Sequence, residues 1–304
     1  MPNQGLAYAM LAFTLWGVFP IFWKMLGDVD SVEILAHRIL WGSVFMVLLT
    51  ALRHQWRGIV EILRNRRNML LILTTSLLVA CNWWLNIYAV LADKILEASM
   101  GYYINPLLSV LLGVLFYKER LRPLQWIAIV LAGLGVGYMV ILHGYVPYVA
   151  LMLSGSFAVY GVIKKMATFP SMNGMAVETW LLVLPSLAFV LFLEDSGQGQ
   201  FTGSPYLTTL LVLSGPITLA PLLLFAAAAQ RISLTLLGLC QYIAPTMQLV
   251  IGVLIYGESL DDGKLPAFML IWGALILFTL ENIWSSRKRS RLSPQPPGPD
   301  TASL

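Results

Sequence analysis

Two stretches of this 304-residue chain decide its fold: YYINPLLSVLLGVLFYKERL at residues 102–121 and QYIAPTMQLVIGVLIYGESL at residues 241–260. When 103–121 is aligned with 242–260, nine of nineteen positions are identical. Each stretch is an apolar run of helical length with a proline near its start. The chain therefore carries an internal repeat, whose matched residues include Tyr103/Tyr242, Pro106/Pro245, Gly113/Gly252 and Glu119/Glu258.

The composition excludes whole classes of protein. Fifty-eight per cent of the residues are hydrophobic and only 11% are charged, whereas a soluble domain has roughly 45–50% apolar and about 25% charged residues. A water-soluble globule and a disordered chain are both excluded. A bilayer span needs ~20 apolar residues, so the length accommodates about ten spans.

The apolar runs are hydrophobic around the whole helical turn. A barrel strand would instead alternate apolar and polar residues, so the runs are helices. We predict an all-α polytopic membrane protein, with residues 285–304 as a disordered, basic and proline-rich tail. The ten transmembrane helices are expected at about 5–26, 34–52, 69–91, 96–117, 124–142, 147–166, 176–193, 206–229, 234–256 and 265–284.

Lysine and arginine set the expected orientation. With the N-terminus in the cytoplasm, fifteen of the 19 basic residues fall in inside loops and the tail, while the outer loops are acidic. Both termini are then cytoplasmic. Because the basic patches act as the orientation signal, we do not expect a nucleic-acid partner; the surrounding partner is the lipid bilayer.

The repeat divides the chain into two five-helix halves, residues 1–143 and 144–284. Since five is odd, the second half begins on the opposite side of the membrane. The charges of two equivalent loops support this inversion, because KERLRP at 118–123 is basic and GESLDDGK at 257–264 is acidic. Inverted repeats with interrupted helices recur in secondary transporters. Pro106 and Pro245 are predicted helix kinks, although prolines here could also serve helix packing alone.

Ionisable and polar groups within the spans are the candidate site residues, because an unpaired charge at mid-membrane costs at least ~2.5–3.5 kcal/mol. Glu33, His37 and Trp41 share one helical face and Arg38 stands beside them. Arg38 either faces a cavity or forms a structural pair with Glu33 or Glu97. The candidates of the first half are His37, Arg38, Trp41, Asn82, Asn86, Tyr88, Glu97, Tyr102, Tyr103 and Asn105.

Several of these residues have an equally simple structural role. Asn82 and Asn86 either bind substrate or bridge helices by hydrogen bonds, and Asn105 either binds substrate or satisfies carbonyls freed by Pro106. Lys164 and Lys165 are typical of orientation charges at a span end. The candidates of the second half are Glu178, Trp180, Gln241 and Tyr242.

No recognised catalytic or metal motif is present. Cys81 and Cys240 both lie in apolar runs, and the three histidines are His37, His54 and His143. Neither a metalloprotease motif, a nucleophile elbow nor a phosphate loop is found. We therefore expect no cofactor, no metal and no enzymatic activity, with an enzyme of an unfamiliar kind left open.

The runs VEILAHRILWG (32–42), CNWWLNIYAV (81–90), LEASMGYYINP (96–106) and LGLCQYIAP (237–245) resemble the RarD proteins. That group belongs to the EamA branch of the drug/metabolite transporter superfamily. The similarity extends to about Trp284. It implies ten helices in two inverted halves, a bacterial inner-membrane location and permease function.

From the resemblance and the residues together we expect a secondary carrier for a small metabolite, working by alternating access. Arg38, His37 and Lys24 would suit a carboxylate, while Glu97 or Glu178 would suit an amine or a coupling proton. This mixture favours an amphoteric substrate such as an amino acid. One alternative is proton-coupled efflux of organic cations or drugs; another is a membrane enzyme or receptor that transports nothing.

Overall fold

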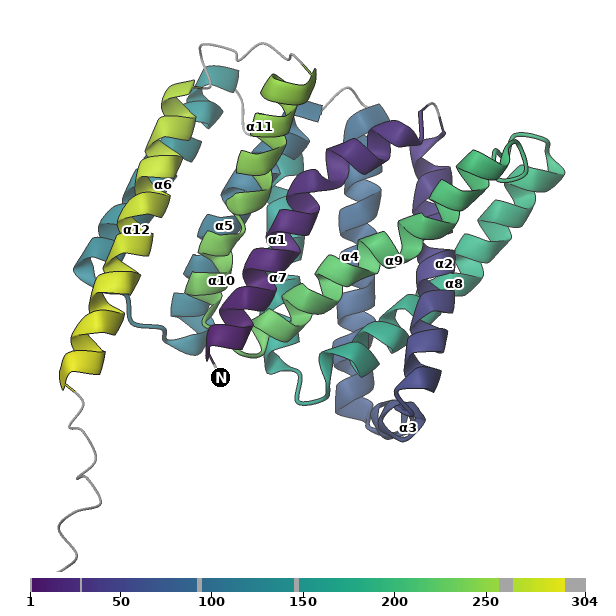
Figure 1. Cartoon of the computed structure of the whole chain (residues 1–304), viewed down its shortest axis with the longest axis horizontal. Helices are drawn as coiled ribbons and strands as arrows, with labels where there is room; N and C mark the ends of the chain where they lie inside the picture. Colours follow the sequence, from purple (N-terminus) through teal and green to yellow (C-terminus); the bar gives the residue numbers. More distant parts are fainter. Residues whose placement is uncertain (1, 28, 92–94, 145–147, 257–264, 293–304) are drawn as a thin grey trace, which may run out of the picture. The chain divides into compact units, whose positions relative to one another are not determined.

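A computed structural model describes residues 2–27, 29–91, 95–144, 148–256 and 265–292 (Figure 1). Within these residues every regular element is a helix, which confirms the all-α prediction. The helices are α1 (Pro2–Met25), α2 (Ser31–Leu52), α3 (Trp56–Arg64), α4 (Arg66–Leu91), α5 (Ile95–Tyr117), α6 (Pro123–His143), α7 (Tyr148–Met166), α8 (Ser171–Asp195), α9 (Pro205–Ala229), α10 (Leu234–Cys240), α11 (Ile243–Tyr256) and α12 (Leu265–Leu292).

Seven segments in the described part of the chain are helical, long and apolar enough to cross a membrane: Gln4–Met25, Ser31–Leu52, Arg66–Asn86, Tyr148–Met166, Ser171–Asp195, Pro205–Ala229 and Leu234–Tyr256. Three further apolar helices are shorter: Gly101–Tyr117, Pro123–Tyr138 and Met269–Phe278. The chain is therefore a multi-span protein. The count of ten spans and their inverted arrangement stay predictions.

The contacts divide the chain into two compact units. The smaller unit comprises residues 120–144 and 261–304, and in it α6 packs along α12. Arg122 of this unit forms an ion pair with Glu281 at 3.2 Å. The helix α12 continues to Leu292, past the expected span end at 284.

The larger unit, residues 1–119 and 145–260, contains all the other helices. In it α5 packs on α7 and α10, α2 on α8 and α9, and α1 on α9 and α11. The helices α2 and α9 pack closely at a pair of glycines. A Cβ on Gly215 of α9 would lie 2.3 Å from the backbone nitrogen of Gly42 on α2, so a larger residue would not fit there. Aromatic rings fill the centre, with Phe225 against Phe13, Trp16, Phe157 and Tyr160.

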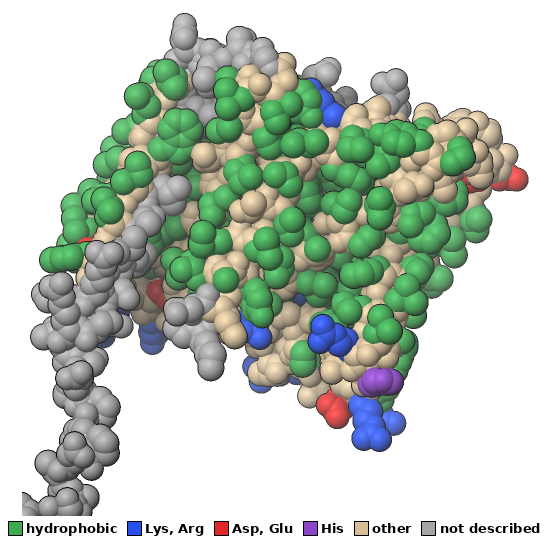
Figure 2. All heavy atoms as spheres, viewed as in Figure 1, with side chains coloured by type: hydrophobic (Ala, Val, Ile, Leu, Met, Phe, Trp, Pro, Cys, Tyr) green, Lys and Arg blue, Asp and Glu red, His purple; other side chains and the backbone are tan. Residues whose placement is uncertain are grey.

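The outer surface of the larger unit is apolar, as expected of helices that face lipid. Figure 2 shows hydrophobic side chains spread over the visible face, with most of the visible Lys and Arg gathered at its lower end. Leu70, Leu77 and Leu184 are 69%, 68% and 73% exposed. So many exposed large apolar side chains indicate a hydrocarbon environment.

Two helical details differ from the expected runs. The short helix α3 lies in what the sequence indicates as a basic loop, where its arginines are exposed but Ile59 and Ile62 are each 2% exposed and pack into the core. The expected run 234–256 is divided into α10 and α11 by a turn at Gln241 and Tyr242. Pro245 explains the break, because it lacks the N–H that would bond the Gln241 carbonyl.

The start of α10 is fixed by a residue of the repeat. Glu119 accepts hydrogen bonds from the backbone nitrogens of Leu234 and Thr235, at 2.8 and 3.0 Å. Ser233 caps the same helix end through the nitrogen of Leu236, at 3.1 Å. A carboxylate at a helix N-terminus satisfies otherwise unbonded amides and complements the helix dipole. Glu119 thus has a structural role.

Candidate substrate-binding cavity

A cavity of about 480 Å³ lies inside the larger unit. This volume is within the ~300–1,000 Å³ typical of small-molecule sites. Its walls come from α1, α2, α4, α5, α7, α9, α11 and the turn before α11. The polar residues that line it are Arg38, Asn82, Asn86, Tyr102, Asn105, Ser154, Thr218, Gln241 and Gln248.

One wall of the cavity is aromatic. The helix α1 places Phe13, Trp16, Phe19 and Trp23 on the lining, at spacings of three and four residues that keep them on one face. The Trp16 ring also meets Phe157 of α7 edge to face, with 5.9 Å between centroids. Such rings offer apolar surface and π faces to a ligand.

Arg38 is the single Lys, Arg, Asp or Glu among the described lining residues. Its guanidinium carbon lies 4.4 Å from the ring centre of Trp83, so the two groups form a cation–π contact. Its Nε is buried and has no hydrogen-bond partner among the described residues. A half-buried cation with an unpaired, buried donor is suited to an anionic group on a ligand.

The asparagines of α4 have structural partners. The Asn82 amide nitrogen donates to the Leu153 carbonyl and to the Ser156 hydroxyl, both at 2.9 Å. Asn86 donates to the Asn82 carbonyl at 3.1 Å. Tyr102 reaches the Asn86 side-chain oxygen at 3.4 Å. The two bonds of Asn82 join α4 to α7, and the bond from Tyr102 joins α5 to α4.

Two buried amide oxygens on the lining are left without a donor. Gln241 donates from its side-chain nitrogen to the Ser109 hydroxyl at 3.0 Å, but its Oε1 has no partner among the described residues. The Oδ1 of Asn105 is also buried and has no hydrogen-bond partner among the described residues. An unsatisfied buried acceptor costs ~1–3 kcal/mol, so both oxygens favour a ligand with N–H or O–H donors.

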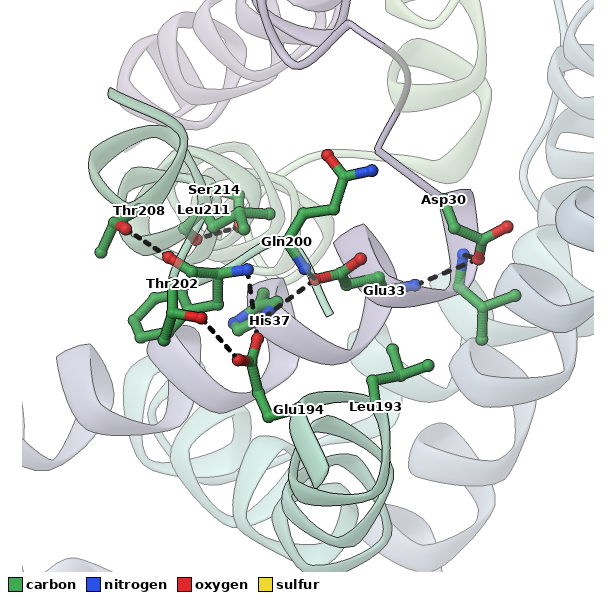
Figure 3. A network of polar contacts seen from close by, with 12 residues as sticks. Asp30, Glu33, His37, Leu193, Glu194, Gln200, Thr202, Thr208, Leu211 and Ser214 are labelled. Carbon is green, nitrogen blue, oxygen red and sulfur yellow. Dashed lines mark hydrogen bonds and ion pairs between the residues drawn. The ribbon is translucent and has the colours of Figure 1, made fainter. Parts of the chain in front are cut away.

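Other predicted residues lie away from this cavity, beginning with His37 and Trp41. Both rings stack on Phe201, with centroids 4.8 and 5.8 Å away. Figure 3 shows how the loop that carries Gln200 and Thr202 is held between α2 and α8. Glu33 accepts from the Gln200 nitrogen at 2.7 Å, and Glu194 accepts from the Phe201 nitrogen at 3.2 Å and the Thr202 hydroxyl at 2.9 Å.

Glu178 and Trp180 occupy a second location on α8. Glu178 is buried and forms an ion pair of 2.6 Å with Lys164, which is buried as well. Thr75 also donates to the same carboxylate. Trp180 stacks on Trp56 of α3, with 5.9 Å between centroids. Lys164 therefore does not reach toward water, as an orientation charge at a span end would.

The remaining predicted residues are tyrosines, the prolines and Glu97. Tyr242 donates to the Tyr103 carbonyl at 3.3 Å, and neither residue lines the cavity. Tyr88 stacks on Trp84. Pro106 lies within the continuous helix α5, whereas Pro245 lines the cavity at the start of α11. Glu97 has a side chain outside the described residues.

Sequence reasoning missed several lining residues. Gln248 donates to the Trp16 carbonyl at 3.1 Å, and Thr218 has a buried hydroxyl with no described partner. The spacing of the α1 aromatics carried a signal for their shared face. For Gln248 and Thr218 the sequence carries no signal of a position on the lining, apart from a polar residue within an apolar run. Among the described residues, no group of three or more His, Cys, Asp or Glu could hold a metal ion.

Comparison with known proteins identifies the family. The EamA-like transporter family matches residues 3–141. An uncharacterized transporter of Vibrio cholerae is 42% identical over 92% of this chain and 93% of its own length. Protein RarD of Escherichia coli K12 is 38% identical over 95% of this chain and 98% of its own. This chain belongs to the RarD group of the EamA-like transporter family.

The EamA family membership settles the broad class. The chain is a membrane transporter, and its bacterial RarD relatives support a location in the inner membrane. A protein known from a crystal structure shares the fold, with a TM-score of 0.68 and 20% identity over 91% of this chain and 97% of the other. The relatives are described as transporters, which points away from an enzyme.

Proposed function

We propose that this protein is a secondary carrier for a small amphoteric metabolite such as an amino acid. The observation that carries the proposal is the cavity of about 480 Å³ that is lined together by Arg38, by the aromatic wall of α1 and by two residues whose amide oxygens have no described partner. Arg38 binds the carboxylate of the substrate. The oxygens of Asn105 and Gln241 accept from its amino group, and the rings of α1 contact its apolar part.

The proposed architecture is ten transmembrane helices in two inverted repeats, residues 1–143 and 144–284, with both termini in the cytoplasm. The repeat around Pro106 and Pro245 and the distribution of Lys and Arg support it. The three shorter apolar helices complete the ten spans. Alternating access then opens the cavity to each side in turn, as in other carriers built from inverted repeats.

Efflux of organic cations is less well supported. Such a carrier needs a carboxylate at the binding site, and the described lining residues include no Asp or Glu. Glu97, whose side chain lies outside the described residues, is the acid on which that alternative would depend. Loss of cation transport in Glu97→Gln, with Arg38 replaceable, would favour it.

The test uses the purified full chain in liposomes. Exchange of radiolabelled L-phenylalanine, L-leucine, L-glutamate and L-lysine is measured beside tetraphenylphosphonium, a permanent organic cation. We expect exchange of at least one zwitterionic amino acid, in unmodified form, and none of tetraphenylphosphonium. Exchange of the cation alone, chemical conversion of the amino acid, or no amino-acid exchange would contradict the proposal.

The topology is tested separately with a reporter fused to the C-terminus. A cytoplasmic reporter is expected. A reporter on the outer side would contradict the even number of spans and with it the inverted repeat.

A further inference from the structure

The short helix α3 joins two spans at one surface of the membrane. The candidate spans Ser31–Leu52 and Arg66–Asn86 stand just before and just after it in the chain. In Figure 1 α3 is seen almost along its axis, at the end of the larger unit where α2 ends and α4 begins. The helix therefore lies across the direction of these spans, at the level where the hydrocarbon meets the lipid headgroups.

One face of α3 fixes it to the protein. Ile59 and Ile62 are buried in the same apolar cluster as Met175 of α8. On the same side, a Cβ on Gly58 would lie 2.3 Å from the side-chain nitrogen of Asn173. These contacts hold α3 against α4 and α8, so its outward faces have a fixed direction.

A second face of α3 is apolar and exposed. Trp56, Val60 and Leu63 are 45%, 44% and 48% exposed. At about 100° per residue, these three side chains fall within an arc of about 60° beside the buried face. Trp56 also stacks on Trp180 of α8, which holds its ring in place. An exposed apolar stripe is typical of helices that lie in the membrane interface and insert the stripe among acyl chains.

The third face of α3 is charged, and its residues stand in a definite order. Arg57 and Arg64 are exposed and come next to the apolar stripe around the helix, while Glu61 lies further round, away from the stripe. This order places the two arginines between the acyl chains and the water. A guanidinium group offers a fork of N–H donors that matches the oxygens of a phosphate.

Three more exposed arginines flank α3. Arg53 follows α2, and Arg66 and Arg67 begin α4, whose first turn contains no acidic residue. The positive end of a helix dipole repels basic side chains in the first turn. Glu61 is the only acid between residues 53 and 67. In the part of the chain that the structure describes, none of the five arginines of this segment forms an ion pair.

We propose that α3 and its flanking arginines form a binding site for the headgroups of anionic phospholipids. The phosphate of the lipid accepts hydrogen bonds from the guanidinium groups, and the acyl chains cover the apolar stripe. The site is separate from the large cavity, since no residue of α3 lines that cavity. It requires only that the chain is a membrane protein, whatever its substrate.

The surroundings of α3 favour a lipid over a soluble anion. Leu52 at the end of α2 and Leu70 in α4 are 77% and 69% exposed, so the stripe adjoins the lipid-facing surface of the spans. A free phosphate would use the arginines and leave the stripe in water. A lipid matches both the positive charge and the apolar surface.

Orientation of the chain does not by itself account for this arrangement. The positive-inside rule counts Lys and Arg in a loop and is indifferent to the helical face that they occupy. A headgroup site instead requires the order of apolar stripe, arginine and water that α3 displays.

The first test measures lipid binding to the purified full chain in neutral detergent by native mass spectrometry. Dioleoyl phosphatidylglycerol is the anionic probe, and dioleoyl phosphatidylcholine is the zwitterionic control. We expect binding of the anionic lipid to be at least about ten-fold tighter. Inorganic phosphate in excess should leave the lipid bound. Equal binding of the two lipids, or displacement by phosphate, would overturn the proposal.

A double variant locates the binding on α3. Arg57→Gln/Arg64→Gln should weaken the binding of phosphatidylglycerol about 30-fold, since each basic side chain near anionic headgroups contributes about five-fold. Lys118→Gln/Arg120→Gln is the matched control, because it removes the same charge from exposed residues after α5. Its affinity should stay close to that of the wild type. An undiminished affinity in the α3 variant, or an equal loss in the control, would refute the site.

Insertion of the apolar stripe is tested by the accessibility of spin labels in liposomes. Cys81 is exposed and is first replaced by Ala, whereas Cys240 is buried. A nitroxide is then attached at Val60→Cys or at Glu61→Cys, two neighbours on different faces. We expect oxygen to relax the label at position 60 more than a water-soluble nickel complex does, and the reverse at position 61. The same preference at both positions would show that the stripe does not enter the membrane.

These readouts need no substrate, so they are independent of the proposed carrier function. Anionic-lipid binding without amino-acid exchange would leave the lipid site standing and end the substrate proposal. Amino-acid exchange by a protein that does not prefer the anionic lipid would end the lipid proposal alone.

Discussion

The hydroxyl of Tyr242 donates a hydrogen bond to the backbone carbonyl of Tyr103 at 3.3 Å, and the two residues lie 139 positions apart in the chain. They occupy the same position in the two repeated stretches. The residue that precedes Tyr242, Gln241, donates a hydrogen bond to the Ser109 hydroxyl. Matched segments of the repeat therefore contact each other beside the cavity, which Gln241 lines.

Tyr242→Phe removes this bond without changing the ring. A buried hydrogen bond contributes about 1 kcal/mol, which lowers an apparent Tm by about 1.5–2 °C when the unfolding entropy per residue is scaled to a chain of this length. Thermal unfolding of both proteins in detergent measures this change in Tm. Tyr206→Phe is the control, since Tyr206 is 57% exposed. Equal shifts in the two variants would show that the bond contributes nothing specific.

Gly238 is the contact point between α10 and α5. A Cβ at this position would lie 2.8 Å from the carbonyl oxygen of Pro106, so Gly238→Ala forces the helices apart. Overpacking of this kind costs about 1–3 kcal/mol. In Gly155→Ala the added methyl meets open space, and stability should hold or rise. Thermal unfolding of Gly238→Ala at the wild-type temperature would argue against the close packing.

Trp83 supports Arg38 from α4. Trp83→Leu removes the cation–π contact of 4.4 Å, and we expect the concentration of amino acid for half-maximal exchange to rise about 5–30-fold, because a desolvated contact contributes about 1–2 kcal/mol. Trp84→Leu changes the neighbouring residue, which is 59% exposed. An affinity loss in Trp84→Leu as large as in Trp83→Leu would contradict the role of the stack.

Glu194 holds the loop between α8 and α9 by two hydrogen bonds. In Glu194→Gln the charge that strengthens both bonds is lost. Hydrogen exchange followed by mass spectrometry should then be faster in the peptide covering residues 198–203. Asp195→Asn alters the next acid, which is exposed, and should leave the rate unchanged. The same rate in Glu194→Gln as in the wild type would show that this carboxylate does not hold the loop.

The sequence was sufficient for the helical class because the apolar runs are unambiguous. It also revealed the repeat, since matched residues such as Tyr103 and Tyr242 stand at one fixed offset. The short helix α3 was missed because a basic loop and an amphipathic helix have similar composition. Only the burial of Ile59 and Ile62 distinguishes them.

The inward faces were harder to predict for a physical reason. A lipid-facing side and a core-facing side are equally apolar, so hydrophobic periodicity does not tell them apart. Arg38, Asn105 and Gln241 were found because polar groups are costly in a span. The sequence indicates an orientation charge at Lys164, because a lysine near a span end looks the same in sequence whether it reaches water or pairs with Glu178.

The central claim is that Arg38 in the large cavity binds the carboxylate of the substrate. The most direct measurement compares amino-acid exchange in liposomes containing Arg38→Gln and Lys24→Gln, since Lys24 is also a basic residue of a span but stacks on Tyr256 outside the cavity lining. A hydrogen bond to a charged group contributes about 1.5–3 kcal/mol, so Arg38→Gln should weaken apparent affinity by roughly 10–100-fold. Lys24→Gln should resemble the wild type. Wild-type exchange by Arg38→Gln would contradict the account.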